Sequence, residues 1–228
     1  MSKYFIFILI VFIAGFFIPE RFVNNRYHPD NENVVVENTI SSSWNKELTE
    51  KYGLAPEIIQ MALKNISELK EKNLIKNNSI LTIIDFSRPS TDKRLFILDL
   101  KNEKVIKNTL VAHGVNSGNN MAESFSNNQH SNKSSLGFYI TKGTYSGKHG
   151  YSLRIDGKNI GLNNNALKRD IVIHGADYVS EDFIKKNGRI GRSFGCPAVP
   201  VEENQEIIDL IKNGTCLYIY HPVLNPTD

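Results

Sequence analysis

The sequence predicts a β-rich α+β domain. Short runs of β-branched and aromatic residues recur between residues 80 and 220, separated by turn-forming residues. Only two segments show the apolar spacing of an amphipathic helix, one near each end of this region. Because the strands do not alternate with helices, the pattern favours an α+β domain over a series of β-α units.

The first helix is predicted at residues 56–72. Pro56 suits a first helical position, and the apolar residues that follow fall on one face: Ile59, Ala62, Leu63, Ile66 and Leu69. The second helix is predicted at residues 202–212, with Ile207, Ile208 and Ile211 on one face. It ends at Asn213–Gly214, a favourable C-cap.

Seven strands are predicted, all bounded by polar or turn residues. They span residues 80–86, 94–100, 104–112, 137–141, 152–155, 171–174 and 215–220. Residues 116–133, rich in Ser, Asn and Gly, form a long loop, either on the substrate side of the domain or simply mobile.

The composition is that of one globular domain with appendages. The chain has 228 residues, 40% of them hydrophobic and 22% charged, which is enough to bury a substantial core. Its formal net charge is +3, but the Lys and Arg residues are scattered without a run of five. This distribution argues against nucleic acid as a partner.

The N-terminus predicts export. Lys3 precedes an uncharged apolar run at residues 4–18, whose length is that of a signal-peptide core and a little short for a membrane span. No Ala-x-Ala cleavage site follows, so residues 1–19 are predicted as either a signal peptide or a membrane anchor. A polar linker is predicted at residues 20–46, a catalytic domain at 47–222 and a short tail at 223–228.

The most informative stretch is residues 171–198. A β-branched run ends at His174-Gly175, and a Gly- and Ser-rich turn then presents Cys196. A thiol becomes a strong nucleophile as a thiolate, and a nearby imidazole is the usual base. Gly175 and Gly195 suit a backbone that approaches a substrate closely or offers N–H groups to an oxyanion.

The two cysteines leave a second interpretation open. In an oxidising compartment Cys196 and Cys216 form a possible disulfide. Cys216, however, lies in the apolar run 215–220, where a thiol commonly serves as a small buried hydrophobic group. A permanent disulfide also excludes Cys196 as the nucleophile.

The combination of His174-Gly175 with Gly191-Arg192-Ser193-Phe194-Gly195-Cys196 resembles the signature of the L,D-transpeptidase catalytic domain family. These enzymes are cysteine acyltransferases of the bacterial cell wall. The similarity covers residues 49–220 and includes the stretches 96–100, 111–118, 134–139 and 148–153. The resemblance implies a sandwich- or barrel-like domain with a few flanking helices, without a metal or other cofactor.

The resemblance implies that Cys196 is the nucleophile and His174 its base, with the N–H groups of Gly195 and Cys196 as the oxyanion hole. The commoner family motif reads Ser-His-Gly-Cys followed by a hydrophobic residue and Arg. Here Phe194 replaces that His, and Pro197-Ala198 replace the hydrophobic-Arg pair. Arg192 is the candidate for the missing arginine, because a guanidinium matches a carboxylate. The other residues predicted to bind substrate are Ser193, Gly175 and His149.

Other roles for these residues remain open at this point. Three His-Gly pairs and one Cys supply a conceivable zinc set of His113, His149, His174 and Cys196, although their spacing matches no compact zinc motif. Ser193 either orients His174 or substrate, or stabilises its own turn. The group that orients His174 is unassigned; relatives use a backbone carbonyl, and Asp177 is the acidic candidate.

The predicted function is therefore peptidoglycan L,D-transpeptidation in the cell envelope or periplasm, with wall stem peptides as partners. The domain is expected to be either released there or anchored to the cytoplasmic membrane. Two rival functions remain. An L,D-carboxypeptidase or other cysteine peptidase uses the same Cys-His pair but lets water resolve the thioester. A non-catalytic wall-binding module keeps the cleft without the chemistry.

Overall fold

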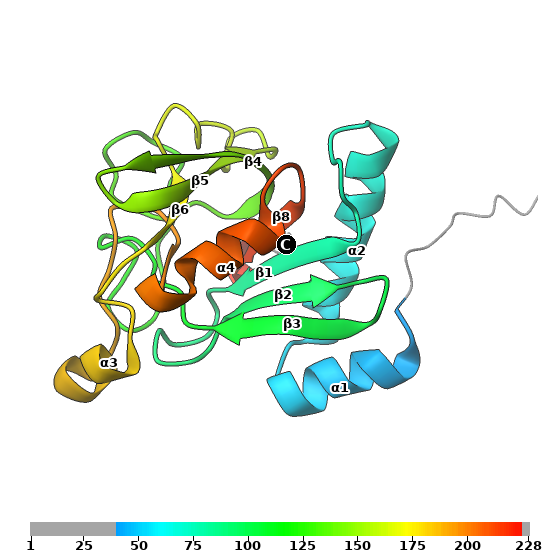
Figure 1. The fold of residues 1–228 in the computed structure, drawn as a ribbon, viewed down its shortest axis with the longest axis horizontal. Helices are drawn as coiled ribbons and strands as arrows, with labels where there is room; N and C mark the ends of the chain where they lie inside the picture. The colour runs from blue at the N-terminus through cyan, green and yellow to red at the C-terminus, as the bar shows by residue number, and fades with distance from the viewer. Residues whose placement is uncertain (1–39, 225–228) are drawn as a thin grey trace, which may run out of the picture. The chain divides into compact units, whose positions relative to one another are not determined.

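Eight strands form one mixed sheet in the computed structural model, which describes residues 40–224 (Figure 1). The sheet order is β3-β2-β1-β8-β4-β5-β6-β7, and only the β1–β8 and β6–β7 pairs are parallel. The strands are β1 (Ile80–Asp85), β2 (Leu95–Asp99), β3 (Lys104–Thr109), β4 (Gly137–Gly147), β5 (Gly150–Gly157), β6 (Val172–Gly175), β7 (Ala198–Val199) and β8 (Cys216–Tyr220).

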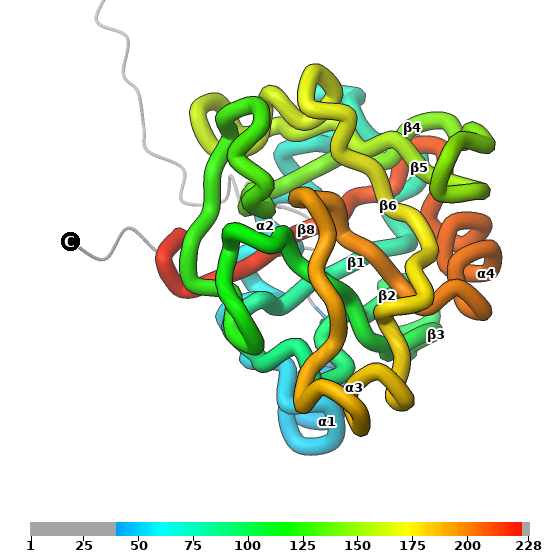
Figure 2. The backbone as a smooth tube through the Cα atoms, turned by 90° about the vertical axis from the view of Figure 1, so that its left-hand side faces the viewer, coloured from blue at the N-terminus to red at the C-terminus, as the bar shows by residue number. Residues whose placement is uncertain are grey.

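The two edges of the sheet meet. Ala112, shortly after β3, forms an isolated antiparallel bridge with Ala198 in β7. The sheet is therefore nearly closed into a barrel, with the chain between β6 and β7 on one side of it (Figure 2). This architecture confirms the predicted β-rich, barrel-like α+β class.

Within residues 40–224, four α-helices accompany the sheet, whereas the sequence predicted two. They are α1 (Ser42–Tyr52), α2 (Pro56–Glu71), α3 (Glu181–Asn187) and α4 (Val201–Ile211), and a 3-10 turn follows at Pro222–Leu224. The predicted helices correspond to α2 and α4. Helix α1 begins at Ser42, inside the segment predicted as linker.

The two unpredicted helices are defined by their caps and not by apolar periodicity. The Ser41 hydroxyl accepts the Trp44 N–H at the start of α1, and Gly53 ends that helix in the left-handed conformation. Ser180 and Gly188 do the same for α3, which buries none of its residues. Such helices leave little signal in a hydrophobic pattern.

Both faces of the central strands are buried. On β8, Leu217 and Ile219 point to the cluster that contains the apolar face of α4, whereas Cys216 and Tyr218 point to the cluster formed with α1 and α2. This alternation explains why β8 reads as an unbroken apolar run. The Tyr218 ring also stacks on Phe138 of β4, with 4.1 Å between ring centroids.

Cys216 is therefore a core residue. Its side chain is fully buried in β8, and burial raises the pKa of its thiol to about 12. Both Cys196 and Cys216 are free thiols, so the alternative disulfide is not formed in this structure. Cys196 remains free to react.

A buried arginine supports the segment that runs beside β7. Arg94 is completely buried, and it donates to the Val111 and Arg88 carbonyls and contacts His113 Nδ1 at 2.8 Å. Its cation also lies over the Phe86 ring at 4.9 Å. This network fixes the backbone at 111–113, which in turn holds the turn before Cys196.

The predicted signal peptide or anchor at residues 1–19 lies outside the described residues, as do most of the predicted linker and tail. Over residues 40–224, no helix is both long enough and apolar enough to cross a membrane.

The buried His113 predicts a specific pH dependence of stability. Burial first, and the Arg94 charge second, lower its pKa to about 4. An unfolded histidine has a pKa of about 6.5, so between these values the unfolded chain binds a proton that the folded chain does not. The free energy of unfolding should therefore decrease as the pH is lowered through this window, by about 3 kcal/mol in total.

Denaturant unfolding between about pH 7 and pH 4 measures this effect. His113→Gln keeps a neutral acceptor for Arg94 and should flatten the curve. Some slope will remain, because burial also lowers the pKa values of His174 and His221. Identical slopes for the two proteins would show that His113 does not titrate as described.

Candidate active site

The turn that carries Cys196 is held mainly through its backbone. The Ser193 N–H donates to the His113 carbonyl at 3.0 Å, and the Val115 N–H donates to the Ser193 carbonyl at 2.7 Å. The Ser193 hydroxyl accepts the Gly195 N–H at 3.0 Å and donates to the Cys196 carbonyl at 2.6 Å. Ser193 thus stabilises its own turn, one of the two roles considered for it.

Gly195 is required by this geometry. Its φ angle is +120°, and a Cβ atom would lie 2.7 Å from the Lys133 carbonyl oxygen and 3.2 Å from Arg169. Its N–H is occupied by Ser193, so in this conformation it is not available to an oxyanion. No hydrogen bond within residues 40–224 uses the Cys196 N–H, which leaves that predicted donor free.

Parallel pairing of β6 with β7 brings Cys196 to His174. In the register His174 lies opposite Ala198, and Gly175 lies opposite Val199. Cys196 is two residues before Ala198, so its side chain emerges beside the strand that carries His174. The separation of 22 residues in sequence is closed by this short strand pair, which the sequence analysis did not predict.

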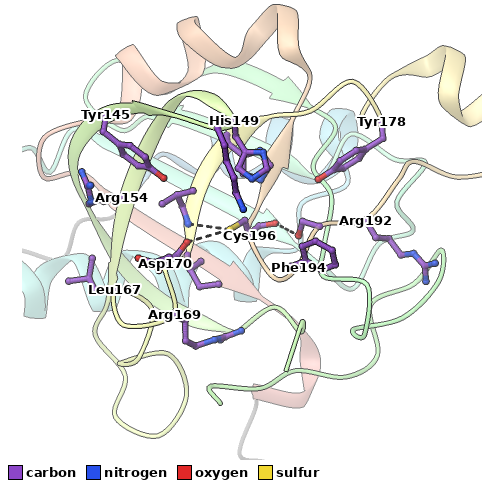
Figure 3. A pocket seen from close by; sticks show the side chains of 15 residues that line it. Tyr145, His149, Arg154, Leu167, Arg169, Asp170, Tyr178, Arg192, Phe194 and Cys196 are labelled. Atoms are coloured by element: carbon purple, nitrogen blue, oxygen red, sulfur yellow. Dashed lines mark hydrogen bonds between the residues drawn. The ribbon is translucent and has the colours of Figure 1, made fainter. Parts of the chain in front are cut away.

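The Cys196 thiol lies against the backbone at the start of β6. Its Sγ accepts the Val172 N–H at 3.5 Å and donates to the Asp170 carbonyl at 3.8 Å (Figure 3). Burial raises the pKa of the thiol, although the Val172 N–H and the charges of Arg169 and Lys148 oppose that rise. The resting group is therefore a neutral thiol.

His174 is oriented by a backbone carbonyl. Its Nδ1 lies 2.9 Å from the Gly175 oxygen, and since a carbonyl only accepts, Nδ1 carries the hydrogen. The lone pair is then on Nε2. Burial lowers the pKa of His174, and the neighbouring Lys148 and His149 add to this effect, so the imidazole is neutral at pH 7. Asp177 is exposed and does not line the pocket.

His149 covers the His174 imidazole. The two rings are stacked with 4.4 Å between their centroids and an interplanar angle of 26°. His149 belongs to the exposed turn between β4 and β5, so the hairpin reaches over β6 at this point. The structure thus brings this predicted residue to the pocket.

Gly175 has a structural reason to be glycine. A Cβ atom there would lie 3.1 Å from Asn204 Cβ on α4, which indicates close packing of β6 against that helix. Gly175 does not line the pocket. Its carbonyl orients His174, and the substrate contact expected of Gly175 stays a prediction.

Cys196 and His174 line one pocket of about 850 Å³ (Figure 3). Its charged lining is mostly cationic, with Asp170 as the single carboxylate. The cationic lining residues are Lys148, Arg154, Arg169 and Arg192. The pocket therefore favours an anionic ligand.

The arginines differ in how far their donors are already used. Arg192 donates through Nη1 to the carbonyls of Val115 and Gly118, and it points away from Cys196. Arg169 donates to two carbonyls and two hydroxyls of the 126–135 segment. It thereby holds the segment predicted as a substrate-side loop against the pocket.

Sequence reasoning missed Arg169 and Arg154. Arg169 lies two residues before Ile171, the start of the β-branched run that ends at His174, and this position was the one available signal for it. Arg154 gave no such signal, because its exposure to the pocket depends on the strand register.

The alternative zinc set is not assembled. His113 belongs to the buried Arg94 network and does not line the pocket. In the described part of the chain, no three His, Cys, Asp or Glu side chains are arranged to hold a metal ion.

Known proteins share this sequence pattern and fold. Residues 50–220 match the family model described as the L,D-transpeptidase catalytic domain. No curated protein gives a significant sequence match.

Solved structures similar to the chain include an L,D-transpeptidase from Mycobacterium smegmatis, with 10% identity, 63% of this chain and 59% of that chain covered, and a TM-score of 0.39. Mycobacterium tuberculosis L,D-transpeptidase 1 has 10% identity, coverage of 64% and 63%, and a TM-score of 0.37. An L,D-transpeptidase from Stackebrandtia nassauensis has 14% identity, coverage of 77% and 75%, and a TM-score of 0.37.

The chain spans about three-fifths of the length of the two mycobacterial structures. The family model, in contrast, matches 171 of the 228 residues, from 50 to 220, and includes both Cys196 and His174. The chain belongs to the L,D-transpeptidase catalytic domain family.

Proposed function

We propose that this protein is a peptidoglycan L,D-transpeptidase that works through a cysteinyl thioester. One observation carries the proposal: Cys196 and an oriented, neutral His174 line the same cationic pocket. The family supports peptidoglycan as the polymer. Its stem peptides carry carboxylates, which fit the charge of this lining.

Acylation begins with proton transfer. The Cys196 side chain rotates from the Asp170 carbonyl toward His174, and Nε2 takes the thiol proton. The thiolate attacks the carbonyl at the L-centre of the donor's diamino acid residue and forms a tetrahedral oxyanion. The free Cys196 N–H stabilises that oxyanion, together with the Gly195 N–H once it leaves the Ser193 hydroxyl.

The intermediate then collapses. The bond to the terminal D-amino acid breaks, and the departing amine takes its proton from the His174 imidazolium. A thioester remains on Cys196. His174 next deprotonates the amine of a second stem peptide, which attacks the thioester and yields the cross-link with a free thiol.

Water in place of that amine gives a trimmed peptide, the outcome of an L,D-carboxypeptidase. Both outcomes use the same acylation. The non-catalytic alternative is less well supported, because a wall-binding module has no need for an oriented imidazole beside a free thiol.

We also propose that the domain acts outside the cytoplasm, in the cell envelope. The family's polymer lies there, and Lys3 with the apolar run 4–18 provides an export signal or an anchor.

Substitution of the two catalytic residues tests the proposal. Cys196→Ser should abolish cross-link formation, and His174→Ala should lower it by about 10²- to 10⁴-fold, the usual contribution of a general base. The measurement is chromatography with mass detection of products from a tetrapeptide donor and a second stem peptide. Far-UV circular dichroism reports whether each variant folds.

Cys216→Ser is the matched control, since it changes the other thiol. It should retain most activity per folded protein, because the Cys216 side chain lies in the core away from the pocket. Normal turnover by Cys196→Ser would contradict the assignment, whereas trimmed peptide without cross-link would identify the carboxypeptidase.

The electrostatics predict a second result. Burial raises the pKa of Cys196 and lowers that of His174, so the resting pair is a neutral thiol and a neutral imidazole. Alkylation of Cys196 by a small neutral reagent should therefore rise with pH, with a midpoint above the ordinary value of about 8.5. The measurement is the alkylation rate from acid to alkaline pH.

A thiolate–imidazolium pair would instead give fast alkylation with a plateau at neutral pH, and that result would contradict the neutral pair. His174→Ala serves as the control, because a neutral imidazole contributes little to the thiolate fraction. Its alkylation profile should stay close to that of the unaltered protein.

A further inference from the structure

Of the three arginines that line the pocket, Arg154 is the one whose donors are all free within residues 40–224. Arg154 lies on β5 with its guanidinium 4.2 Å above the Tyr145 ring of β4. It makes no hydrogen bond or ion pair with any of residues 40–224, and it is exposed on the pocket wall. The face of the Tyr145 ring supports the cation, and the unused N–H groups of the guanidinium can bind a carboxylate through two parallel hydrogen bonds.

A β-bulge builds this stack. Between β4 and β5, Thr141 pairs with Ile155 but Thr144 pairs with Leu153, so β4 has one extra residue opposite Arg154. The bulge brings Tyr145 opposite Ser152, on the same face as Arg154. Without it, Tyr145 would lie one register position away and point to the other face.

Neighbouring charges do not neutralise Arg154. The nearest carboxylate along β5 is Asp156, which already pairs with Lys142 at 3.2 Å and Lys158 at 2.6 Å. Lys148, at the tip of the same hairpin, adds another positive charge to the pocket. The other two arginines of the pocket donate to the protein itself.

The strand register places Arg154 relative to the chemistry. Ser152 lies opposite His174, and Arg154 lies opposite Val172, whose N–H contacts the Cys196 sulfur. Two residues along a strand correspond to about 7 Å. Arg154 and Tyr145 lie on the opposite side of Cys196 from Arg192 (Figure 3).

We propose that Arg154, stacked on Tyr145, is the subsite for a carboxylate at the far end of the donor's diamino acid side chain. The leaving residue's carboxylate is only a few bonds from the scissile carbonyl and so stays near Cys196. A distal carboxylate, as in a diamino dicarboxylic acid, reaches the level of Arg154. This inference rests on the proposed function and adds its preferred donor class.

Three matched donors test the subsite: tetrapeptides whose diamino acid ends in a free carboxylate, in a carboxamide, or as lysine without that group. Arg154→Gln should raise KM for the carboxylate donor about ten- to a hundredfold, the loss of one charge-assisted contact, with little change in kcat. The carboxamide and lysine donors should already be poor for the unaltered enzyme, and Arg154→Gln should change them little.

Further variants separate the stack from general charge. Arg154→Lys should keep only part of the preference, because lysine loses the planar fork. Tyr145→Leu should weaken the preference, whereas Tyr145→Phe keeps the ring and should retain it. Lys168→Gln is the control: it removes an exposed cation that does not line the pocket, and it should change neither parameter.

Two results would overturn the subsite: an equal loss for all three donors, or a loss of preference in Arg192→Lys with none in Arg154→Gln. The second result would place the carboxylate at Arg192. If the unaltered protein processes no donor, the proposed function fails on its own. Calorimetric binding of the three peptides to Cys196→Ala then decides the subsite, since tighter binding of the carboxylate peptide that depends on Arg154 supports it and equal binding refutes it.

Discussion

The active site depends on one backbone constraint, the pinning of the 193–198 turn between two neighbouring segments. On one side, β7 pairs in parallel with β6, which fixes Cys196 relative to His174. On the other side, the 112–115 segment exchanges hydrogen bonds with Ser193 and Ala198. Arg94 stabilises that segment from within the core. Cys196 is therefore positioned mainly by the backbone of its turn.

The electrostatics of the pocket follow from burial. Low polarity around Cys196 and His174 favours the uncharged form of both groups, so the thiol and imidazole do not form an ion pair at rest. The charge in the site is instead carried by Lys and Arg side chains around its wall. Such an arrangement attracts an anionic ligand to the pocket while the thiol is still protonated. Arg169 connects the two functions, because its charge acts on Cys196 while its hydrogen bonds hold the 126–135 segment.

The sequence predicted the parts of the fold that depend on hydrophobic periodicity. Helix α2, helix α4 and the apolar strands such as β8 were found because their burial repeats in the chain. Helices α1 and α3 were missed, since caps at Ser41 and Ser180 define them. The two-residue β7 was missed because its existence depends on the tertiary pairing with β6.

The same division applies to the site. Cys196 and His174 were singled out by local chemistry, and the structure brings them to one pocket. Substrate binding by Gly175 and Ser193 stays a prediction; within the protein, the Gly175 carbonyl orients His174, and Ser193 stabilises the turn and lines the pocket. The role of Arg154 could not be predicted from the sequence, because a single extra residue in β4 decides which β4 side chains lie on the same face of the sheet as Arg154. Register of this kind is set by the folded sheet and not by composition.

The central claim is that Cys196 carries the donor as a thioester, and intact-protein mass spectrometry tests it most directly. The protein is mixed with a tetrapeptide donor without an acceptor and quenched in acid. The account predicts a mass gain equal to the donor minus its terminal residue, located by digestion on the peptide that contains Cys196 and removed by hydroxylamine. Consumption of the donor without an adduct, or with an adduct on another residue, would contradict it.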